Sequence, residues 1–222
     1  MLTPRLECIV RHTKGKIIAD IGTDHAYIPI YLIENNLCDY VIAGDIRTGP
    51  AEIAKTNVKN HNLSDKIEVR LGSGLSVLNE NEADTIIIAG MGGQLITEII
   101  EADLKIAHKC RLVLQPMNAQ YELRKYLSDN GFKITDEDIA VEDFKVYNII
   151  NAKKGHETNL KDDIEYHLPK YLKTNKYYKK LYEKKYREFT KVINGLENSN
   201  DIDYKKLNLY KNWLKELKNY ES

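Results

Sequence analysis

Apolar positions follow two alternating patterns in the first 154 residues. Short runs rich in Val, Ile and Leu occupy residues 16–21, 40–46, 66–71, 84–90 and 111–115. Such runs are typical of strands buried on both faces, as in a parallel sheet. Segments with helical spacing occupy residues 26–34, 50–60, 93–103 and 118–128. The alternation predicts right-handed βαβ units and therefore an α/β fold with a doubly wound, mostly parallel sheet.

The end of this region departs from the alternation. Residues 132–143 (FKITDEDIAVED) and 144–154 (FKVYNIINAKK) both read as extended segments, and only a short turn near Glu142–Asp143 separates them. No helix fits between them, so they predict an antiparallel hairpin that closes the sheet. In the sheet of a dinucleotide-binding dehydrogenase all strands are parallel, including the strand at the edge. The hairpin therefore counts against that class.

The rest of the chain has the pattern of long helices. One series with +4 and +3 steps is Tyr182, Tyr186, Phe189, Ile193 and Leu196. A second series is Leu207, Tyr210, Leu214 and Leu217. Each series predicts the apolar seam of a coiled-coil-like helix, and residues 197–201 separate the two, with Asn200 or Asp201 as a cap. A shorter, broken helix is expected at residues 161–172, which contain Pro169.

Charge and tyrosine content change at the same place as the pattern. The chain of 222 residues has no net charge, but residues 1–154 hold 18 Lys and Arg against 22 Asp and Glu. Residues 155–222 hold 15 against 11, and nine of the 15 tyrosines. We therefore place two domains at 1–154 and 155–222. A basic, tyrosine-bearing segment can contact phosphates and bases, although a solvated helix face has the same composition.

The composition excludes several classes of protein. No stretch approaches the ~20 apolar residues that span a bilayer, and the N-terminus lacks the pattern of a signal peptide. Cys8, Cys38 and Cys110 are far apart and match no zinc spacing. We expect a cytoplasmic protein with free thiols, no membrane association and no metal.

Ligands of open α/β sheets bind outside the carboxyl ends of the central strands. The stretch ADIGTDHAYIPI (19–30) ends the first run with Asp20 and continues through a turn at Gly22. Asp45 ends the second run, and an acidic residue about 20 residues beyond a glycine turn suits two ribose hydroxyls. The third and fourth ends are glycine-rich, with LGSGL at 71–75 and AGMGG at 89–93.

Each of these features has a structural alternative. Asp45 could cap the next helix, and Gly92–Gly93 could form a tight turn. Together they fall in order at adjacent strand ends, which favours a nucleotide-like ligand. The phosphate-binding motif of P-loop proteins is absent, and so are the three glycines that approach a pyrophosphate. A cofactor with a ribose and no diphosphate fits this pattern, and S-adenosylmethionine is such a cofactor.

The string ADIGTDHAYIPI, followed in order by AGDI, GSGL, IAGMGG and LQP, resembles the TrmK family of bacterial tRNA methyltransferases. The resemblance implies a class I, Rossmann-like fold with a C-terminal coiled-coil domain. It also implies transfer of a methyl group from S-adenosylmethionine to N1 of adenine 22 in the D-arm of tRNA. Ser73 stands where relatives usually carry an acidic residue, so a Ser hydroxyl or backbone would replace that carboxylate.

By position, the resemblance implies a cofactor loop and a ribose clamp at Asp45. The expected cofactor-binding residues are Asp20, Gly22, Thr23, Asp24, Tyr27, Asp45, Ile46, Gly72, Ser73, Gly74, Gly90, Met91 and Gly92. For catalysis we expect Asp24 to stabilise the cationic adenine and Gln115 to hydrogen-bond its edge. The third candidate catalytic residue is His25, which stacks on or hydrogen-bonds to the base, or else serves a structural role at the start of the helix. Tyr27 likewise contacts the base or has a packing role. Met91 forms a wall.

The expected partner is tRNA, and we expect a monomer. The candidate RNA-binding residues are Arg5, Arg11, Lys179, Lys180, Lys184, Lys185 and Arg187. Three rivals stay open: a methyltransferase for another RNA position or a small molecule, a nicotinamide-dependent oxidoreductase, and a non-enzymatic scaffold.

Overall fold

The computed structural model describes residues 2–158, 160 and 163–220 of the chain. The chain divides into two compact units, residues 1–157 and 158–222. The boundary expected from composition lies three residues before this division.

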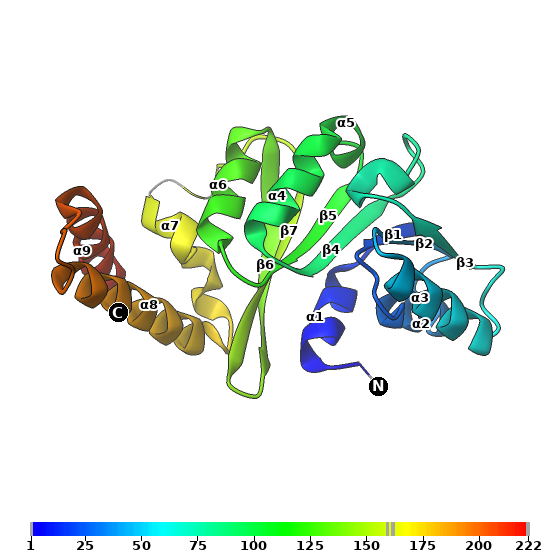
Figure 1. The fold of residues 1–222 in the computed structure, drawn as a ribbon, viewed down its shortest axis with the longest axis horizontal. Helices are drawn as coiled ribbons and strands as arrows, with labels where there is room; N and C mark the ends of the chain where they lie inside the picture. The colour runs from blue at the N-terminus through cyan, green and yellow to red at the C-terminus, as the bar shows by residue number, and fades with distance from the viewer. Residues whose placement is uncertain (1, 159, 161–162, 221–222) are drawn as a thin grey trace. The chain divides into compact units, whose positions relative to one another are not determined.

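The first unit is built on a sheet of seven strands (Figure 1). The parallel strands are β1 (Ile17–Ile21), β2 (Tyr40–Asp45), β3 (Ile67–Leu71), β4 (Thr85–Met91) and β5 (Arg111–Pro116). Two long strands follow, β6 (Phe132–Glu142) and β7 (Lys145–Lys154). The order across the sheet is β3-β2-β1-β4-β5-β7-β6, so sheet growth reverses between β1 and β4. The structure therefore confirms the predicted α/β class.

Helices cover both faces of this sheet (Figure 1). One face carries α1 (Pro4–His12), α2 (Tyr27–Glu34) and α3 (Thr48–Asn60). The other carries α4 (Gly93–Ala102), α5 (Leu104–Ala107) and α6 (Gln120–Asp129), and a short 3-10 helix, η1 (Gly74–Val77), follows β3. The core strands are nearly all apolar and buried, which explains why they read as continuous runs.

The predicted antiparallel hairpin is present, and its second strand is the inner one. Strand β7 pairs antiparallel with both β5 and β6, and Leu114 of β5 lies opposite Ile150. From Ile150 the strand runs back toward residue 145 past the carboxyl end of β5. The tip of the hairpin therefore projects on the side of the sheet where the parallel strands end, and it carries Phe144 with 87% of its surface exposed.

Helix α1 docks on the hairpin through a polar cluster as well as through buried Cys8 and Ile9. The Asp138 carboxylate of β6 accepts from Arg11 Nη2 at 3.1 Å and lies 3.1 Å from His12 Nε2. Sγ of Cys8, a His12 nitrogen and Asp138 lie within 4.8 Å of one another, a grouping that could hold a metal. Arg11 Nη2 also donates to Cys8 Sγ, and burial raises the pKa of that thiol to about 12, so these groups pair with one another as a clamp.

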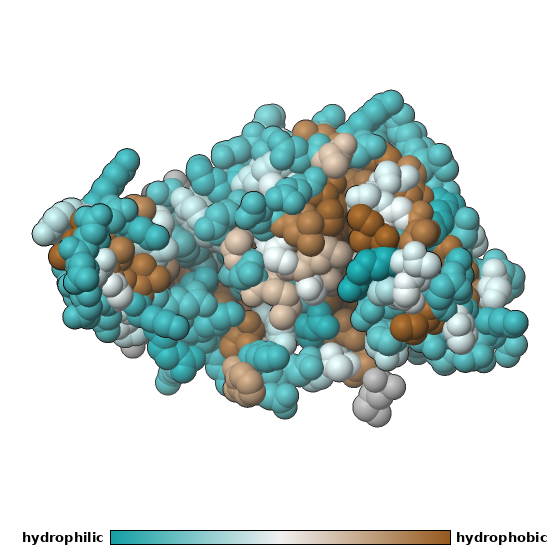
Figure 2. Space-filling view, in the orientation of Figure 1, coloured by the Kyte–Doolittle hydropathy of each residue, from teal (hydrophilic) through white to brown (hydrophobic). Residues whose placement is uncertain are grey.

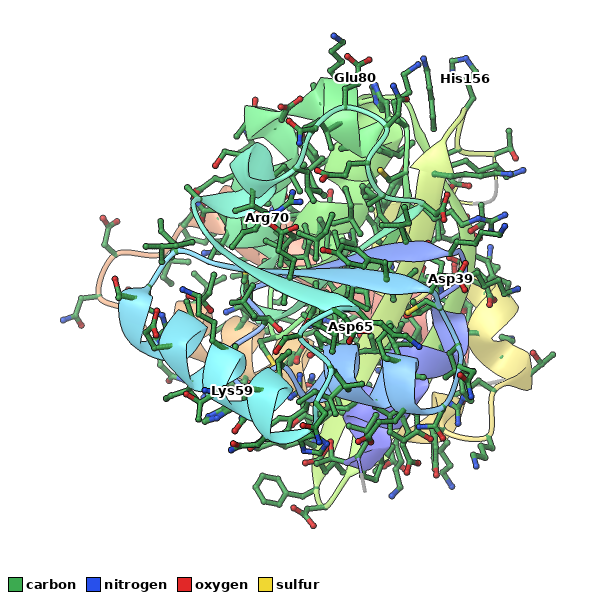
Figure 3. All side chains as sticks on the ribbon, turned by 90° about the vertical axis from the view of Figure 1, so that its right-hand side faces the viewer. Asp39, Lys59, Asp65, Arg70, Glu80 and His156 are labelled. Atoms are coloured by element: carbon green, nitrogen blue, oxygen red, sulfur yellow. The ribbon has the colours of Figure 1, made fainter. Side chains whose placement is uncertain are left out.

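The edge strand β3 is protected by charge (Figure 3). Arg70 Nη2 contacts Glu68 at 2.6 Å and Glu82 at 2.7 Å. Hydrogen bonds from Arg70 hold the pKa of Glu82 at about 2. Charged side chains on an edge strand oppose pairing with another chain.

The second unit is helical, as the pattern predicts. It contains α7 (Asp163–His167), a 3-10 helix η2 (Lys170–Thr174), α8 (Tyr178–Glu197) and α9 (Tyr204–Lys218), and α8 packs on α9. The break expected at Pro169 separates α7 from η2, while residues 161–162 of that expectation lie outside the described residues. Helix α9 is capped by Asp203, whose side chain accepts from the Lys206 N–H, rather than by Asn200 or Asp201.

The buried seam of this unit differs in part from the expected one. Tyr186 is exposed, and Trp213 is the central aromatic residue instead. Its ring centroid lies 4.3 Å from that of His167, 5.0 Å from that of Tyr210 and 5.9 Å from that of Phe189. None of the helices in the described part of the chain is long and apolar enough to cross a membrane.

A fully buried ion pair joins α6 to the hairpin. Arg124 Nη2 lies 2.7 Å from Glu137 Oε2, its Nε lies 3.0 Å from Oε1, and neither side chain has exposed surface. Such a pair adds little net stability over apolar residues, but loss of one partner leaves a buried charge without compensation.

Arg124→Met should therefore lower the free energy of unfolding by about 3–5 kcal/mol, measured by urea denaturation. The double variant Arg124→Met/Glu137→Met removes both charges and should lose less. Lys125→Met, at the exposed neighbouring position of α6, is the control and should change stability by about 0.5 kcal/mol or less. A double variant as unstable as Arg124→Met alone would contradict this account.

Candidate active site

A cavity of about 630 Å³ lies at the carboxyl edge of the sheet. It lies at the topological switch point between β1 and β4, where the strand order changes direction. It is enclosed by the loops after β1, β2, β3 and β4 and by the start of α1. Figure 2 shows apolar side chains gathered on this face. The lining residues are Thr3, Arg5, Leu6, Asp20, Ile21, Gly22, Thr23, Asp24, Tyr27, Ile28, Gly44, Asp45, Ile46, Arg47, Gly72, Ser73, Gly74, Ala89, Gly90, Met91, Leu95 and Ile99.

The loop after β1 has an unusual backbone. Gly22, Asp24 and Ala26 have φ of +78°, +51° and +57°, a left-handed conformation in which alanine is strained. The N–H groups of Gly22 and Thr23 donate to the carbonyl oxygen of Gly44 at 2.8 and 3.1 Å. A Cβ on Gly22 would also overlap the methyl group of Met91. The turn thus requires glycine for its φ, whereas the terminal methyl group of Met91 could move aside.

Asp45 ends β2 with its side chain only 3% exposed. Its Oδ1 accepts from the backbone N–H of Arg47 at 2.9 Å, and Arg47 Nε lies 3.7 Å from the same oxygen. Among the described residues, Oδ2 accepts no hydrogen bond. A fixed carboxylate with one oxygen free beside a cavity suits a pair of vicinal hydroxyl groups.

The loop after β3 and the start of α4 form an apolar slot at the same end of the cavity. Gly74 has a φ of +53°, and a Cβ there would crowd Ile99 at 3.2 Å. Ile46 and Leu95 line the cavity and are among the most exposed large apolar residues of the chain. Apolar side chains left exposed beside a glycine loop are suited to packing on the faces of a flat ring.

Asp20 is the most perturbed carboxyl group of the cavity. Burial raises its pKa to about 6, and the negative charge of Asp45 adds to the rise. Near neutral pH the carboxyl is therefore mostly ionised although it is buried, and a cationic ligand in the cavity would stabilise this charged form.

Asp24, His25 and Tyr27 form the rim. His25 Nε2 lies 3.6 Å from Asp24 Oδ2, and the His25 ring stacks on Tyr27 with centroids 5.2 Å apart. Tyr27 is 56% exposed and lines the cavity together with Asp24. His25 is not a lining residue, so its contacts place it behind the other two.

Comparison with known proteins adds the decisive observation. The model of the family described as TrmK, tRNA (adenine(22)-N(1))-methyltransferase, matches residues 18–218. The chain belongs to the TrmK family. This finding confirms the resemblance carried by the loop after β1.

Curated and solved relatives agree with the TrmK assignment. A tRNA (adenine(22)-N(1))-methyltransferase of Bacillus subtilis is 42% identical over 156 residues, which cover 69% of this chain and 66%, just under two thirds, of that protein. The crystal structure of the Bacillus subtilis m1A22 tRNA methyltransferase TrmK matches with a TM-score of 0.90 at 31% identity, covering 100% of this chain and 99% of that one.

A second solved structure was determined with a ligand. A putative tRNA (m1A22) methyltransferase of Streptococcus pneumoniae, in complex with S-adenosyl-L-methionine, matches with a TM-score of 0.85 at 32% identity. The match covers 99% of each chain. The fold class, including the C-terminal helices, is thus shared with TrmK structures along nearly the whole chain.

Two residues expected in the TrmK site lie elsewhere. Gln115 is fully buried and does not line the cavity, because its Oε1 accepts from Arg5 Nη1 at 2.8 Å and from the Gly90 N–H at 3.2 Å. The expectation that Gln115 hydrogen-bonds the adenine edge is therefore wrong for this structure. Gly92 precedes α4 and packs against Asn118, also outside the cavity.

The expected RNA-binding residues lie in different environments. Arg5 lines the cavity, but Arg11 pairs with Asp138 away from it. Lys185 was expected on the RNA-binding surface, yet its side chain is 7% exposed and its Nζ lies 2.8 Å from Glu188, so this expectation is wrong. The remaining candidates are half-buried Lys184 and exposed Lys179, Lys180 and Arg187.

Sequence reasoning missed several lining residues. Thr3 caps the N-terminus of α1 and Leu6 lies on this helix, which shows no motif for a site. Leu95 and Ile99 had a usable signal, because they are apolar residues one helical turn apart after the glycines of β4.

Asp20 generates a pH prediction for the ligand-free protein. Its raised pKa means that folding favours the protonated carboxyl, so this group destabilises the fold as pH rises from about 4, its ordinary range, through about 6. Asp20→Asn should raise the free energy of unfolding by about 2–3 kcal/mol at pH 7. It should leave the free energy of unfolding nearly unchanged at pH 4, and urea denaturation at the two values measures both. An equal effect at pH 4 and pH 7 would show that charge is not the cause.

Proposed function

We propose that this protein methylates N1 of adenine 22 in the D-arm of bacterial tRNA with S-adenosylmethionine as methyl donor. The observation that carries the proposal is the single cavity at the carboxyl edge, which joins the glycine turn after β1 to the carboxylate of Asp45. Membership of the TrmK family supports the substrate. The proposed partner is tRNA and the proposed location is the cytoplasm.

The lining residues fit S-adenosylmethionine. Asp20, Asp24 and Asp45 supply carboxylates for its cationic groups and its ribose, and the slot at Gly72–Gly74 suits its adenine ring. A diphosphate would require either a cluster of cationic residues or more backbone N–H groups, and the loop after β1 offers neither. The Streptococcus pneumoniae relative, which binds S-adenosyl-L-methionine, supports the assignment.

When bound, S-adenosylmethionine supplies an electrophilic methyl group on a sulfonium. The N1 of adenine carries its own lone pair, so no residue has to remove a proton before attack. The protein must hold the base in line and stabilise the positive charge that develops on it. The Asp24 carboxylate, at the rim of the cavity, stabilises this positive charge.

The neighbours of Asp24 orient the base. Tyr27, exposed at the rim, presents a ring face on which an extruded adenine stacks. His25 packs behind Tyr27 and beside Asp24, so it positions both. Met91 forms the wall between the two ends of the cavity, next to Gly22.

The function is tested with purified protein, S-adenosylmethionine and an unmodified tRNA transcript. Mass spectrometry of the digested product should find 1-methyladenosine at position 22, and a transcript with guanosine at 22 should stay unmodified. Methylation at another position, or no methylation of the tRNA at all, would refute the proposal. In a strain from which the gene for this protein is deleted, the same nucleoside should be missing from cellular tRNA.

Two variants separate catalysis from cofactor binding. Asp24→Ala should lower kcat by about 10²-fold or more, since it removes the charge that faces the cation. Asp45→Ala should mainly raise the Kd for S-adenosylmethionine, measured by calorimetry, by about 10-fold or more because the ribose contacts are lost. Asp39→Ala, at the opposite, amino edge of the sheet (Figure 3), is the charge-matched control. Wild-type turnover in Asp24→Ala would remove Asp24 from the site.

A further inference from the structure

Arg5 lies at one end of the cavity, where it is held by Gln115, a residue that does not line the cavity. Its Nη1 donates to Oε1 of Gln115 at 2.8 Å, and its Cζ lies 5.6 Å from the centroid of the Tyr147 ring. Gln115 is fully buried at the end of β5, and its oxygen also accepts from the N–H of Gly90. Gly90, with a φ of +76°, lies where the register of β4 and β5 shifts. Helix α1 and the ends of two strands therefore converge on the position of one guanidinium.

The end of the cavity where Arg5 lies is opposite the proposed cofactor end. Asp45 ends β2 and Gly72–Gly74 follow β3, on one side of β1, whereas Gly90 lies near the end of β4 on the other side. Arg5 lies within reach of Gly90, since a Cβ on that glycine would be 3.6 Å from Arg5 Nη1. The side of β4 is thus the side left for the methyl acceptor.

The free edge of the guanidinium determines what it can bind. Nη1 is used by Gln115, and within the described residues neither Nε nor Nη2 donates a hydrogen bond. These two nitrogens present parallel N–H groups with a positive charge, which match two oxygens of a phosphate. The edges of adenine combine a donor with an acceptor, so they match a donor-only fork poorly.

We propose that Arg5 binds a phosphate adjacent to the target adenosine, and that Gln115 is the positioning residue that orients Arg5 for this contact. The proposal rests on the proposed function, because it takes the acceptor to be a nucleotide within RNA. A phosphate held at the cavity mouth fixes the extruded nucleotide without placing a second cation against the base that becomes positively charged. Arg5 therefore acts on RNA affinity and orientation rather than on the chemical step.

Arg5→Gln tests the phosphate contact. The KM for tRNA should rise about 10- to 100-fold with little change in kcat, and the slope of log affinity against log salt should fall by about 0.7–0.9. Arg5→Lys keeps the charge but not the fork, so it should restore the slope and only part of the affinity. Lys59→Gln, exposed on α3 (Figure 3), is the control for loss of one positive charge and should change neither quantity.

Modified RNA identifies the partner of Arg5. Each phosphate flanking the target adenosine is replaced in turn by a neutral methylphosphonate in a ligated tRNA. One of the two should weaken binding to the wild-type protein by the same factor as Arg5→Gln, and it should have no further effect on the variant. Equal losses in the wild type and in Arg5→Gln, for both positions, would overturn the proposal.

Gln115 is tested by replacement with Leu and, to preserve its shape, with Met. Each variant should raise the KM for tRNA in the wild-type background and add nothing to Arg5→Gln, while the Kd for S-adenosylmethionine stays unchanged. A lower kcat that persists in the Arg5→Gln background would instead mean a direct role for Gln115 in catalysis. Wild-type protein that forms no 1-methyladenosine 22 refutes the function itself, whereas normal methylation with an unchanged KM in Arg5→Gln refutes only this inference.

Discussion

The reversal of strand order between β1 and β4 is the constraint on which the site depends. Strands added after β1 grow toward β3, and strands from β4 onward grow the other way, so their loops diverge. The divergence leaves a hollow at the carboxyl edge that no side chain of the sheet fills. The glycine turn after β1 closes its floor by hydrogen bonds to Gly44 of β2. The residues proposed for cofactor binding take their positions from these strand ends and the loops that follow them.

The two sides of the hollow differ in chemistry, and this difference assigns their ligands. Acidic and apolar groups predominate on the side of β2 and β3, which suits a cationic cofactor with a ribose and a flat ring. The side of β4 carries Arg5, and the rim between them carries Asp24 and Tyr27. Arg47 also lines the cavity on the side of β2, where its Nε lies 3.7 Å from Asp45 Oδ1. A cationic donor and an anionic nucleic acid each meet a complementary surface without neutralising the other's contacts.

The sequence predicts most of the fold because each parallel strand is buried on both faces and bounded by turn residues. Asp45 and the turn at Gly22 could be found for the same reason, since the end of a buried strand fixes where its last side chains lie. The burial of Gln115 could not be found, because spacing alone does not tell whether a side chain near the end of β5 faces the cavity or the core. Lys185 had a readable signal: it lies three residues after Tyr182 and four before Phe189, on the buried face of α8. Trp213 was missed because the expected seam uses its neighbour Leu214. In the structure Trp213 is buried and Leu214 is half-buried.

The docking of α1 on the β6–β7 hairpin has a consequence for the order in which the site forms. Arg5 and Gln115 are 110 residues apart in sequence, and the clamp between Arg11 and Asp138 spans 127. The five parallel strands are complete once residue 116 has been synthesised, but α1, which also contacts α2 and β5, packs mainly on β6 and β7, and these strands follow later. Contacts of such separation form late and slow the search for the native state. The wall that holds Arg5 is thus the first part of the unit to leave the ribosome and among the last to reach its place.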